Sequence, residues 1–131
     1  MASPAAARRA HHPAELHDLI ADAINAGDID ALLDAHDADA TVVVPPDGRP
    51  AHGHDEIRAA IVPLLAMHAQ LTTVAVDVLH AGGLALTHGR WTLALTDAGG
   101  RSELNGLGTM VSRRHDDGTW RVVLDDPLTG A

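Results

Sequence analysis

Hydrophobic residues recur at helical spacing along the first half of the chain. Between Pro13 and Gly27, apolar side chains return every three or four positions, with proline suited to the first helical turn and glycine to the C-terminal cap. The pattern therefore predicts a first helix over these residues. A second, shorter helix is predicted over residues 28–39, where Asp28 can serve as the N-cap. His36 falls on the apolar stripe of this second helix.

A short strand and a third helix are predicted next. Residues 40–44, ATVVV, have the composition of a strand, and the PPDG sequence that follows is typical of a turn. The third helix is predicted to begin near His54, and its apolar row ends at His68. Pro63 lies inside this row and should kink the helix or divide it in two, because its ring removes one backbone donor and crowds the preceding turn.

After about residue 70 the apolar residues recur at every second position, which is typical of strands. Four long strands joined as hairpins are predicted, separated by turn sequences such as DAGG and HDDG. Alternation places Val74, Val76 and Val78 on one face of the first of these strands, and Trp91 on the inward face of the second. Helices followed by strands predict an α+β domain with a meandering antiparallel sheet.

Composition narrows the partners and the location that we expect. The chain of 131 residues allows one domain, which we place at residues 13–131 after a flexible tail over 1–12. Without cysteine there is no disulfide framework and no Cys-ligated metal. The formal charge of −9 has the wrong sign for following a phosphate backbone, so we expect no nucleic acid partner. The apolar runs are too short for a membrane span, and we expect a cytoplasmic protein.

The 10 histidines raise the question of metal binding. His52, His54 and Asp55 are close in sequence, but a mononuclear site needs three or four converging ligands, and the start of the third helix already accounts for Asp55. His11 and His12 belong to the predicted tail. The chain has no P-loop, dinucleotide or nucleophile-elbow motif. We therefore predict no metal and no other cofactor.

Four segments carry a resemblance to a known family: NAGDIDALLDAHDADATVVVPPDG, then GHDEI, ALTHGRWTL and finally HDDGTWRV. Their order resembles the nuclear transport factor two-like superfamily, close to its SnoaL-like polyketide cyclase and ketosteroid isomerase branches. The resemblance covers about residues 14–127. It implies a cone-shaped, cystatin-like fold, with three N-terminal helices packed in a curved antiparallel sheet around an apolar pocket. It also implies a homodimer formed through the outer sheet face, to which Leu107, Thr109 and Val111 would contribute.

The ketosteroid isomerase branch uses an Asp base and an oxyanion hole made of Tyr and a protonated carboxylic acid. The resemblance puts these roles at Ile20, Val44 and Met110, whose side chains can neither accept nor donate the proton. We therefore expect no ketosteroid isomerase activity of that kind, although the three positions should still line the pocket. On the last strand, alternation from the same alignment turns Val123 and Asp125 inward.

Asp125 is the first candidate for chemistry, since a carboxyl group at the wide end of an apolar cone would have a raised pKa. Its alternative is a strand-end aspartate that faces water or caps a turn. His36 is the second candidate, as a proton relay or a donor to a ligand carbonyl, against the alternative of a buried histidine bonded to a backbone carbonyl. His68 is a third candidate of the same kind. Trp91 would form a flat wall of the pocket, or serve packing alone.

Two functions remain open from the sequence. The first is cofactor-independent isomerisation, cyclisation or dehydration of a hydrophobic, polyketide-like or steroid-like molecule. Asp125 would then be the acid or base, His36 its partner or the donor to a carbonyl, and Trp91 a wall. The second is a non-catalytic ligand-binding or association domain of the same fold. The two readings differ in whether polar side chains converge inside the cone.

Overall fold

The computed structural model describes residues 8–45 and 47–130, with only the backbone described at 129 and 130. Three helices and six strands make up these residues. In chain order they are α1 (Glu15–Ala26), α2 (Ile29–Asp34), β1 (His36–Val44), β2 (Arg49–His52), α3 (Gly53–Leu65), β3 (Gln70–Ala81), β4 (Leu84–Asp97), β5 (Gly100–Arg114) and β6 (Trp120–Gly130).

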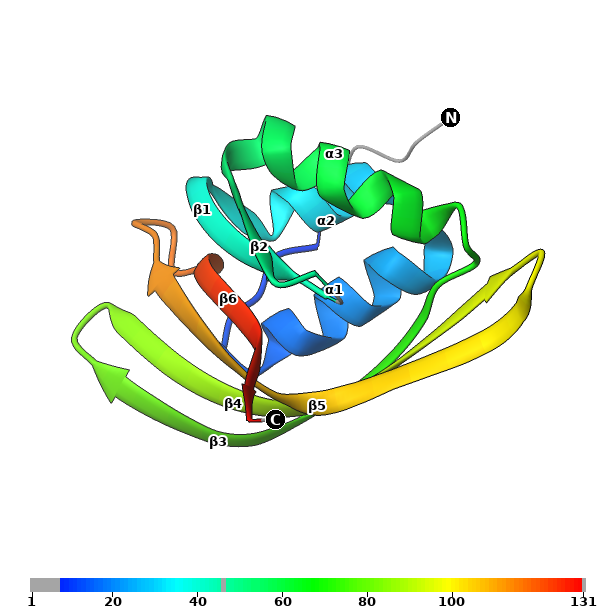
Figure 1. The fold of residues 1–131 in the computed structure, drawn as a ribbon. Helices are drawn as coiled ribbons and strands as arrows, with labels where there is room; N and C mark the ends of the chain where they lie inside the picture. Colours follow the sequence, from blue (N-terminus) through cyan, green and yellow to red (C-terminus); the bar gives the residue numbers. More distant parts are fainter. Residues whose placement is uncertain (1–7, 46, 131) are drawn as a thin grey trace.

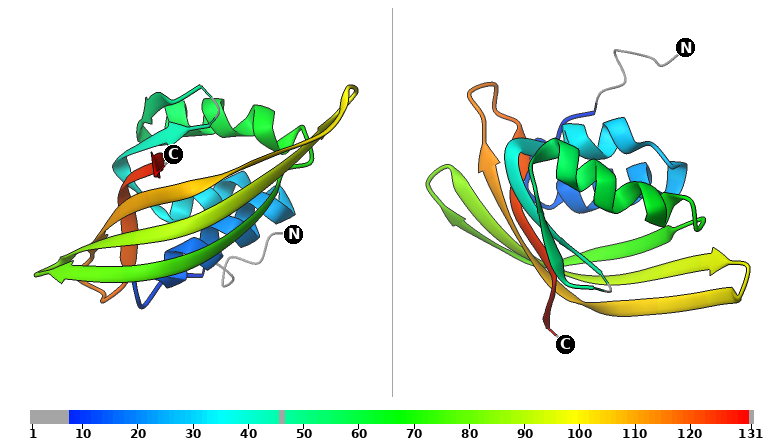
Figure 2. Two further views of the ribbon diagram at one scale, coloured as in Figure 1. Left: turned by 60° about the horizontal axis from the view of Figure 1, so that its bottom comes forward. Right: turned by 45° about the horizontal axis from the view of Figure 1, so that its top comes forward.

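The strands form one curved sheet, and the helices lie on its concave side (Figure 1). The strand order is β2-β1-β6-β5-β4-β3. Figure 2 shows that the long strands β3, β4 and β5 curve along one side of the helices. Apolar side chains between the helices and the sheet form the core, in which Leu16, Ile57 and Val122 are completely buried. The predicted α+β fold, with helices packed inside a curved sheet, is confirmed.

The sheet is mixed, which corrects the prediction of a wholly antiparallel one. Strands β3 to β6 are antiparallel neighbours, as hairpin connections require. β1, however, runs parallel to β6, with Val42 opposite Asp125. Nearly the whole domain separates these two strands in the chain, so no tight turn imposes an antiparallel direction on them.

The second helix is shorter than predicted, and His36 does not belong to it. The side chain of Asp28 caps α2 as expected, but the helix ends at Asp34 and His36 is the first residue of β1. The Val122 N–H donates to the Ala35 carbonyl at 2.8 Å, which brings the chain alongside β6. Strand pairing therefore replaces the helical spacing from His36 onward.

The sequence pattern missed one strand. Residues Arg49–His52 form β2, which pairs antiparallel with β1 and places Ala51 opposite Val42. Pro50 obscures the pattern, because proline lacks a backbone N–H and is depleted in strands. It is tolerated here since β2 is an edge strand of the sheet.

The third helix begins at Gly53, next to the predicted start, and continues through Pro63 to Leu65. Because Pro63 lies in the last turn, it does not divide the helix. His68 follows the helix with a φ of 52° and an exposed side chain. The prediction that His68 lies on an inward row is therefore wrong, because the helical spacing ends before it.

A β-bulge changes the face on which the β3 valines lie. The pairing of β3 with β4 shifts register between Ala75 and Asp77. As a result Val74 and Val76 point outward, with 60 % and 51 % of their surface exposed, whereas Val78 packs against the core. An extra residue in one strand reverses the alternation after it, and simple alternation from the sequence could not show this.

A second bulge affects β6. Ser112 pairs with Val122 and Val111 pairs with Leu124, so β6 has one residue more than β5 at this point. Val122 is therefore the buried residue, and Val123 is not among the residues that line the cavity described below. The prediction that Val123 faces inward is wrong for this reason.

The segment before α1 contacts the sheet. Ala10 is 1 % exposed, and its carbonyl accepts a hydrogen bond from the Trp120 N–H at 2.8 Å. Trp120 is itself buried, with the His80 ring edge-on at a centroid distance of 5.7 Å. Of the segment predicted as a tail, residues 1–7 lie outside the described residues, and Ala10 packs on the domain.

Candidate functional site

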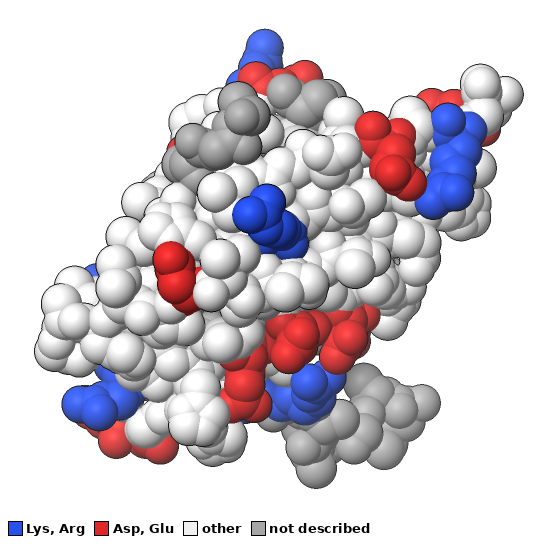
Figure 3. Space-filling view, turned by 90° about the horizontal axis from the view of Figure 1, so that it is seen from below, with Lys and Arg blue, Asp and Glu red and all other residues white. Residues whose placement is uncertain are grey.

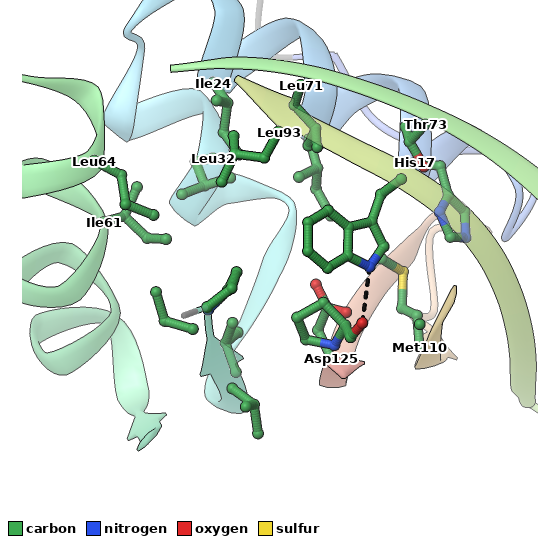
Figure 4. A pocket seen from close by; sticks show the side chains of 18 of the residues that line it. His17, Ile24, Leu32, Ile61, Leu64, Leu71, Thr73, Leu93, Met110 and Asp125 are labelled. Carbon is green, nitrogen blue, oxygen red and sulfur yellow. Dashed lines mark hydrogen bonds between the residues drawn. The ribbon is translucent and has the colours of Figure 1, made fainter. Parts of the chain in front are cut away.

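A cavity of about 120 Å³ lies between the helices and the concave face of the sheet. Ile20, Val44 and Met110 line it, as expected, so aliphatic and thioether groups occupy the positions that the isomerase resemblance gave to polar residues. Figure 4 shows further apolar side chains around the same space. These include Ile24 from α1, Ile61 and Leu64 from α3, Leu71 from β3 and Leu93 from β4.

Asp125 is the acidic side chain among the lining residues. It reaches the cavity from β6, where Val42 of β1 and Met110 of β5 are its neighbours in the sheet. Figure 4 shows Asp125 and Met110 on the same side of the cavity. Burial raises the pKa of Asp125 to about 7, and the neighbouring negative charge of Asp126 adds to the increase. Within the described part of the chain, the carboxyl group has no hydrogen bond that would favour its charged form. Both protonation states are therefore populated near neutral pH.

His36 lines the same cavity but is held in one protonation state. Its Nδ1 lies 2.7 Å from the Leu32 carbonyl oxygen, and because a carbonyl can only accept, the proton must be on Nδ1. Burial, together with the nearby His54, lowers the pKa of His36 to about 4, so its ring is neutral near pH 7. Nε2 then carries no proton. The expected relay or donor role is not available to His36, whose free ring nitrogen can only accept a hydrogen bond.

His17 was not predicted from the sequence, yet it also lines the cavity. Its side chain comes from α1 and is 7 % exposed, with Nε2 at 2.8 Å from the Thr87 hydroxyl of β4. Burial lowers the pKa of His17, and the nearby charge of Asp18 opposes this only in part. The ring is therefore a neutral, hydrogen-bonded group like that of His36.

Two sequence signals could have located His17. It stands three and seven residues before Ile20 and Ile24, which places it on the apolar face of the first helix. The inward-facing β4 residues across from His17 are small, and the smallest of them is Gly89. A Cβ atom at Gly89 would lie 2.7 Å from His17 Cε1, so the imidazole ring fills the space that glycine leaves.

Trp91 forms a wall of the cavity, as predicted. Its indole Nε1–H donates to the Pro127 carbonyl at 2.7 Å (the dashed line in Figure 4), which fixes the ring against the end of β6. A Cβ atom at Gly106 would come within 3.1 Å of the same ring, so β5 also approaches it closely. The N–H is thus occupied, and only the apolar surface of the ring is available to a ligand.

The structure brings some of the predicted residues together and leaves others apart. Asp125, His36 and Trp91 line one cavity, whereas His68 and Val123 lie outside it. In the described ranges, 8–45 and 47–130, no three His, Asp or Glu side chains are arranged as a metal site requires. His52 and His54 point to different partners, the Thr41 hydroxyl and the His36 carbonyl.

Comparison with known proteins agrees with this architecture. A family model described as a SnoaL-like domain matches residues 16–123. No curated protein matches the chain.

Solved structures show the same fold at low sequence identity. A conserved protein from Planctomyces limnophilus is 21 % identical, with a TM-score of 0.76, over 86 % of this chain and 89 % of its own. A protein from Thiobacillus denitrificans, provisionally described as a calcium/calmodulin-dependent protein kinase type II association domain, is 21 % identical, with a TM-score of 0.74, over 93 % and 99 %.

A third solved structure is described by the name of its fold. An NTF2-like protein with a cystatin-like fold from Novosphingobium aromaticivorans is 21 % identical, with a TM-score of 0.71, over 90 % of this chain and 80 % of its own. At these identities the structures establish the cystatin-like fold alone. The family model covers most of the domain, including the residues of α1 that border the cavity, and ends two residues before Asp125 of β6. The chain therefore belongs to the SnoaL-like domain family.

Proposed function

We propose that the protein binds a small hydrophobic molecule in this cavity and transfers a proton on it without a cofactor. The observation that carries the proposal is the Asp125 carboxyl group, which has no hydrogen-bonding partner among the described residues and lies among mostly apolar side chains. A pKa near 7 suits a general acid or base, because both forms are then present at working pH. Isomerisation, cyclisation and dehydration of a polyketide-like or steroid-like molecule are the reactions that such a group can perform.

The other lining residues would position the substrate. The Trp91 ring offers an apolar surface to a planar molecule, and His36 Nε2 offers a hydrogen-bond acceptor. Ile20, Val44 and Met110 would contribute only apolar contact. Proton transfer therefore depends on Asp125 and not on the residue positions that ketosteroid isomerases use.

Proton transfer can be tested without knowing the natural substrate. Unconjugated steroid ketones and polycyclic β-dicarbonyl compounds are incubated with the protein in deuterated water, and exchange of the acidic C–H is followed by NMR. We expect exchange that rises through about pH 7 and falls by about 100-fold or more in Asp125→Asn, since general base catalysis contributes on this scale. Asp116→Asn removes an exposed turn carboxylate and should leave the rate unchanged.

Two results would contradict the proposal. One is binding of these compounds without any exchange above the buffer rate. The other is an exchange rate that Asp125→Asn and Asp116→Asn leave equally unaffected. The first result would favour the ligand-binding alternative, in which the cavity holds a molecule without changing it.

A non-catalytic association domain is the second candidate, and the outer sheet face favours it. Val74 and Val76 expose more than half of their surface there. Figure 3 shows this side of the molecule, where uncharged side chains cover most of the surface and a basic side chain lies near the centre. Exposed aliphatic side chains on a sheet face are typical of a surface that contacts another chain. We propose that two copies pair through this face, with Leu107, Thr109 and Val111 of β5 contributing as expected from the resemblance.

Sedimentation equilibrium tests this pairing. We expect a species of twice the chain mass at micromolar concentration, and a single-chain species when Val74 and Val76 are both changed to Asp, because charges cannot be buried unpaired in the interface. Thr72 is also exposed on β3, and Thr72→Ser adds no charge there, so this variant should sediment like the wild type. A wild-type protein that sediments as one chain would exclude the dimer.

The remaining expectations about location and partners stay predictions. No helix in the described ranges combines the length and the apolar character needed to cross a bilayer. The cytoplasmic location and the absence of a nucleic acid partner rest on composition and charge alone.

A further inference from the structure

The polar groups of the cavity are mainly acceptors, and this restricts the ligand. The polar side chains that line it include Asp125, His17, His36 and Thr73. Arginine is absent from this lining, and the chain contains no lysine. A ligand therefore meets one acid and two neutral imidazoles, and no fixed positive charge.

We propose that the ligand of this cavity carries a basic nitrogen, and that its ammonium group pairs with the Asp125 carboxylate while its hydrophobic part contacts Trp91 and the aliphatic walls. This inference rests on the proposed function, since it concerns the same site and names the chemical class that occupies it. It also distinguishes basic amines from anionic molecules, which the apolar walls alone would accept equally.

An anionic ligand is disfavoured by the charges around Asp125. Asp126 follows it on β6, and β1, β4 and β5 place no charged side chain on the cavity wall beside it. His17 and His36 are both kept neutral by burial, so neither supplies a positive charge. A ligand carboxylate or phosphate would add a second negative charge to a site with a low dielectric constant and no cation.

A cationic nitrogen, in contrast, would compensate the negative charge of the Asp125 carboxylate. An isolated carboxylate in apolar surroundings is unfavourable, and an ammonium group within hydrogen-bonding reach offsets the cost by a charge-assisted bond. An ammonium group has several N–H donors, and His36 Nε2 is an acceptor that no other described residue occupies. A ligand hydroxyl could satisfy either acceptor, but without the charge.

Such a ligand would also decide the direction of proton transfer. A positive charge beside Asp125 favours its ionised form and brings the pKa down from about 7. The bound carboxyl group would then act as a base and not as an acid. The reaction would begin with removal of a proton from the ligand.

Three probes that share one phenyl ring test the inference: phenethylamine, phenethyl alcohol and phenylacetate. Isothermal titration of the intact protein at about pH 8, where Asp125 is mostly ionised, should give the amine an affinity about tenfold or more above that of the alcohol. Phenylacetate should bind most weakly. Asp125→Asn should remove the advantage of the amine over the alcohol, while Asp116→Asn should leave the affinities of both probes unchanged.

The dependence on pH gives a second, independent readout. Lowering the pH from about 8 to about 5.5 protonates Asp125 in the free protein, so the affinity of the amine should fall and its advantage over the alcohol should disappear. Fluorescence of Trp91 in a Trp120→Phe protein locates the bound probe, because Trp91 is then the single indole and lines the cavity.

The outcomes separate this inference from the function on which it rests. Equal binding of amine and alcohol, or an amine preference that survives in Asp125→Asn, overturns the basic nitrogen and leaves a cavity for neutral molecules. Failure of all three probes to bind or to change Trp91 fluorescence overturns the ligand cavity itself, and both proposals with it. C–H exchange that depends on Asp125, without amine preference, supports the function alone.

Discussion

Replacing Asp125 with asparagine is expected to raise the free energy of unfolding at about pH 8 by about 2–4 kcal/mol, since each pKa unit corresponds to about 1.4 kcal/mol. The amide has nearly the shape of the carboxyl group but never ionises. It therefore avoids the cost that the folded protein bears when Asp125 loses its proton in the cavity. A gain in stability on removing an ionisable side chain is a sign of a group kept for function.

The pH dependence follows from the two pKa values of Asp125, about 7 in the folded protein and an ordinary 3.8 in the unfolded chain. Below about pH 4 the carboxyl group is protonated in both the folded and the unfolded state. The wild type and Asp125→Asn should then have the same free energy of unfolding. Between about pH 4 and pH 7 the unfolded chain ionises first, so rising pH progressively favours unfolding of the wild type. Above about pH 7 the difference is complete and stays constant.

Urea unfolding of the wild type, Asp125→Asn and Asp116→Asn over this pH range measures the effect. The Asp125 variant should match the wild type near the acid end and become more stable with rising pH. The Asp116 variant should follow the wild type throughout, because that side chain is exposed in a turn. An Asp125→Asn protein that is less stable than the wild type at about pH 8 would show that the carboxylate is compensated in the folded state.

Gly108→Ala is expected to lower the free energy of unfolding by about 2–3 kcal/mol, the upper part of the usual range for overpacking. A Cβ atom at this position would lie 2.7 Å from Pro127 Cα and 3.2 Å from the Asp126 carbonyl oxygen. Both are backbone atoms, so no side chain can rotate away and the end of β6 would have to move. Since Pro127 accepts the Trp91 N–H, this movement would reach the cavity wall as well.

Gly83→Ala is the matched control, because no atom lies within 4 Å of the added methyl group. It should unfold within about 0.5 kcal/mol of the wild type, as surface substitutions usually do. Urea unfolding gives the stability of both variants, and Trp91 fluorescence reports whether the indole environment changes in Gly108→Ala. If both variants have wild-type stability and emission, then β5 and β6 are not in the close contact described.

The fold was largely predictable because periodicity reports on burial along each element. α1, α3 and the four long strands each show a consistent helical or alternating pattern, and Gly27 marks the end of α1. The errors occurred where a local irregularity breaks the period. The extra residues near Ala75 and Val123 reverse the alternation without changing composition, and Pro50 obscures a strand that pairs at the sheet edge.

The candidate site was predicted only in part, for a similar reason. Asp125 was found because its partner across the sheet, Met110, was correctly placed by the resemblance. His36 was found on its apolar position, although as a helix residue, and the bond that fixes its proton on Nδ1 appears only in three dimensions. His17 was missed since its partners, Thr87 and Gly89, lie far away in the sequence on β4.

The close approach of His17 to Gly89 has a consequence for how this chain can evolve. A side chain cannot be gained at position 89 while the imidazole ring fills the space above it. A smaller residue at position 17, in contrast, leaves only a void and an unpaired Thr87 hydroxyl. The two substitutions are therefore tolerated in one order only: His17 must be replaced before Gly89. A lineage that retains His17 also retains glycine on the facing strand.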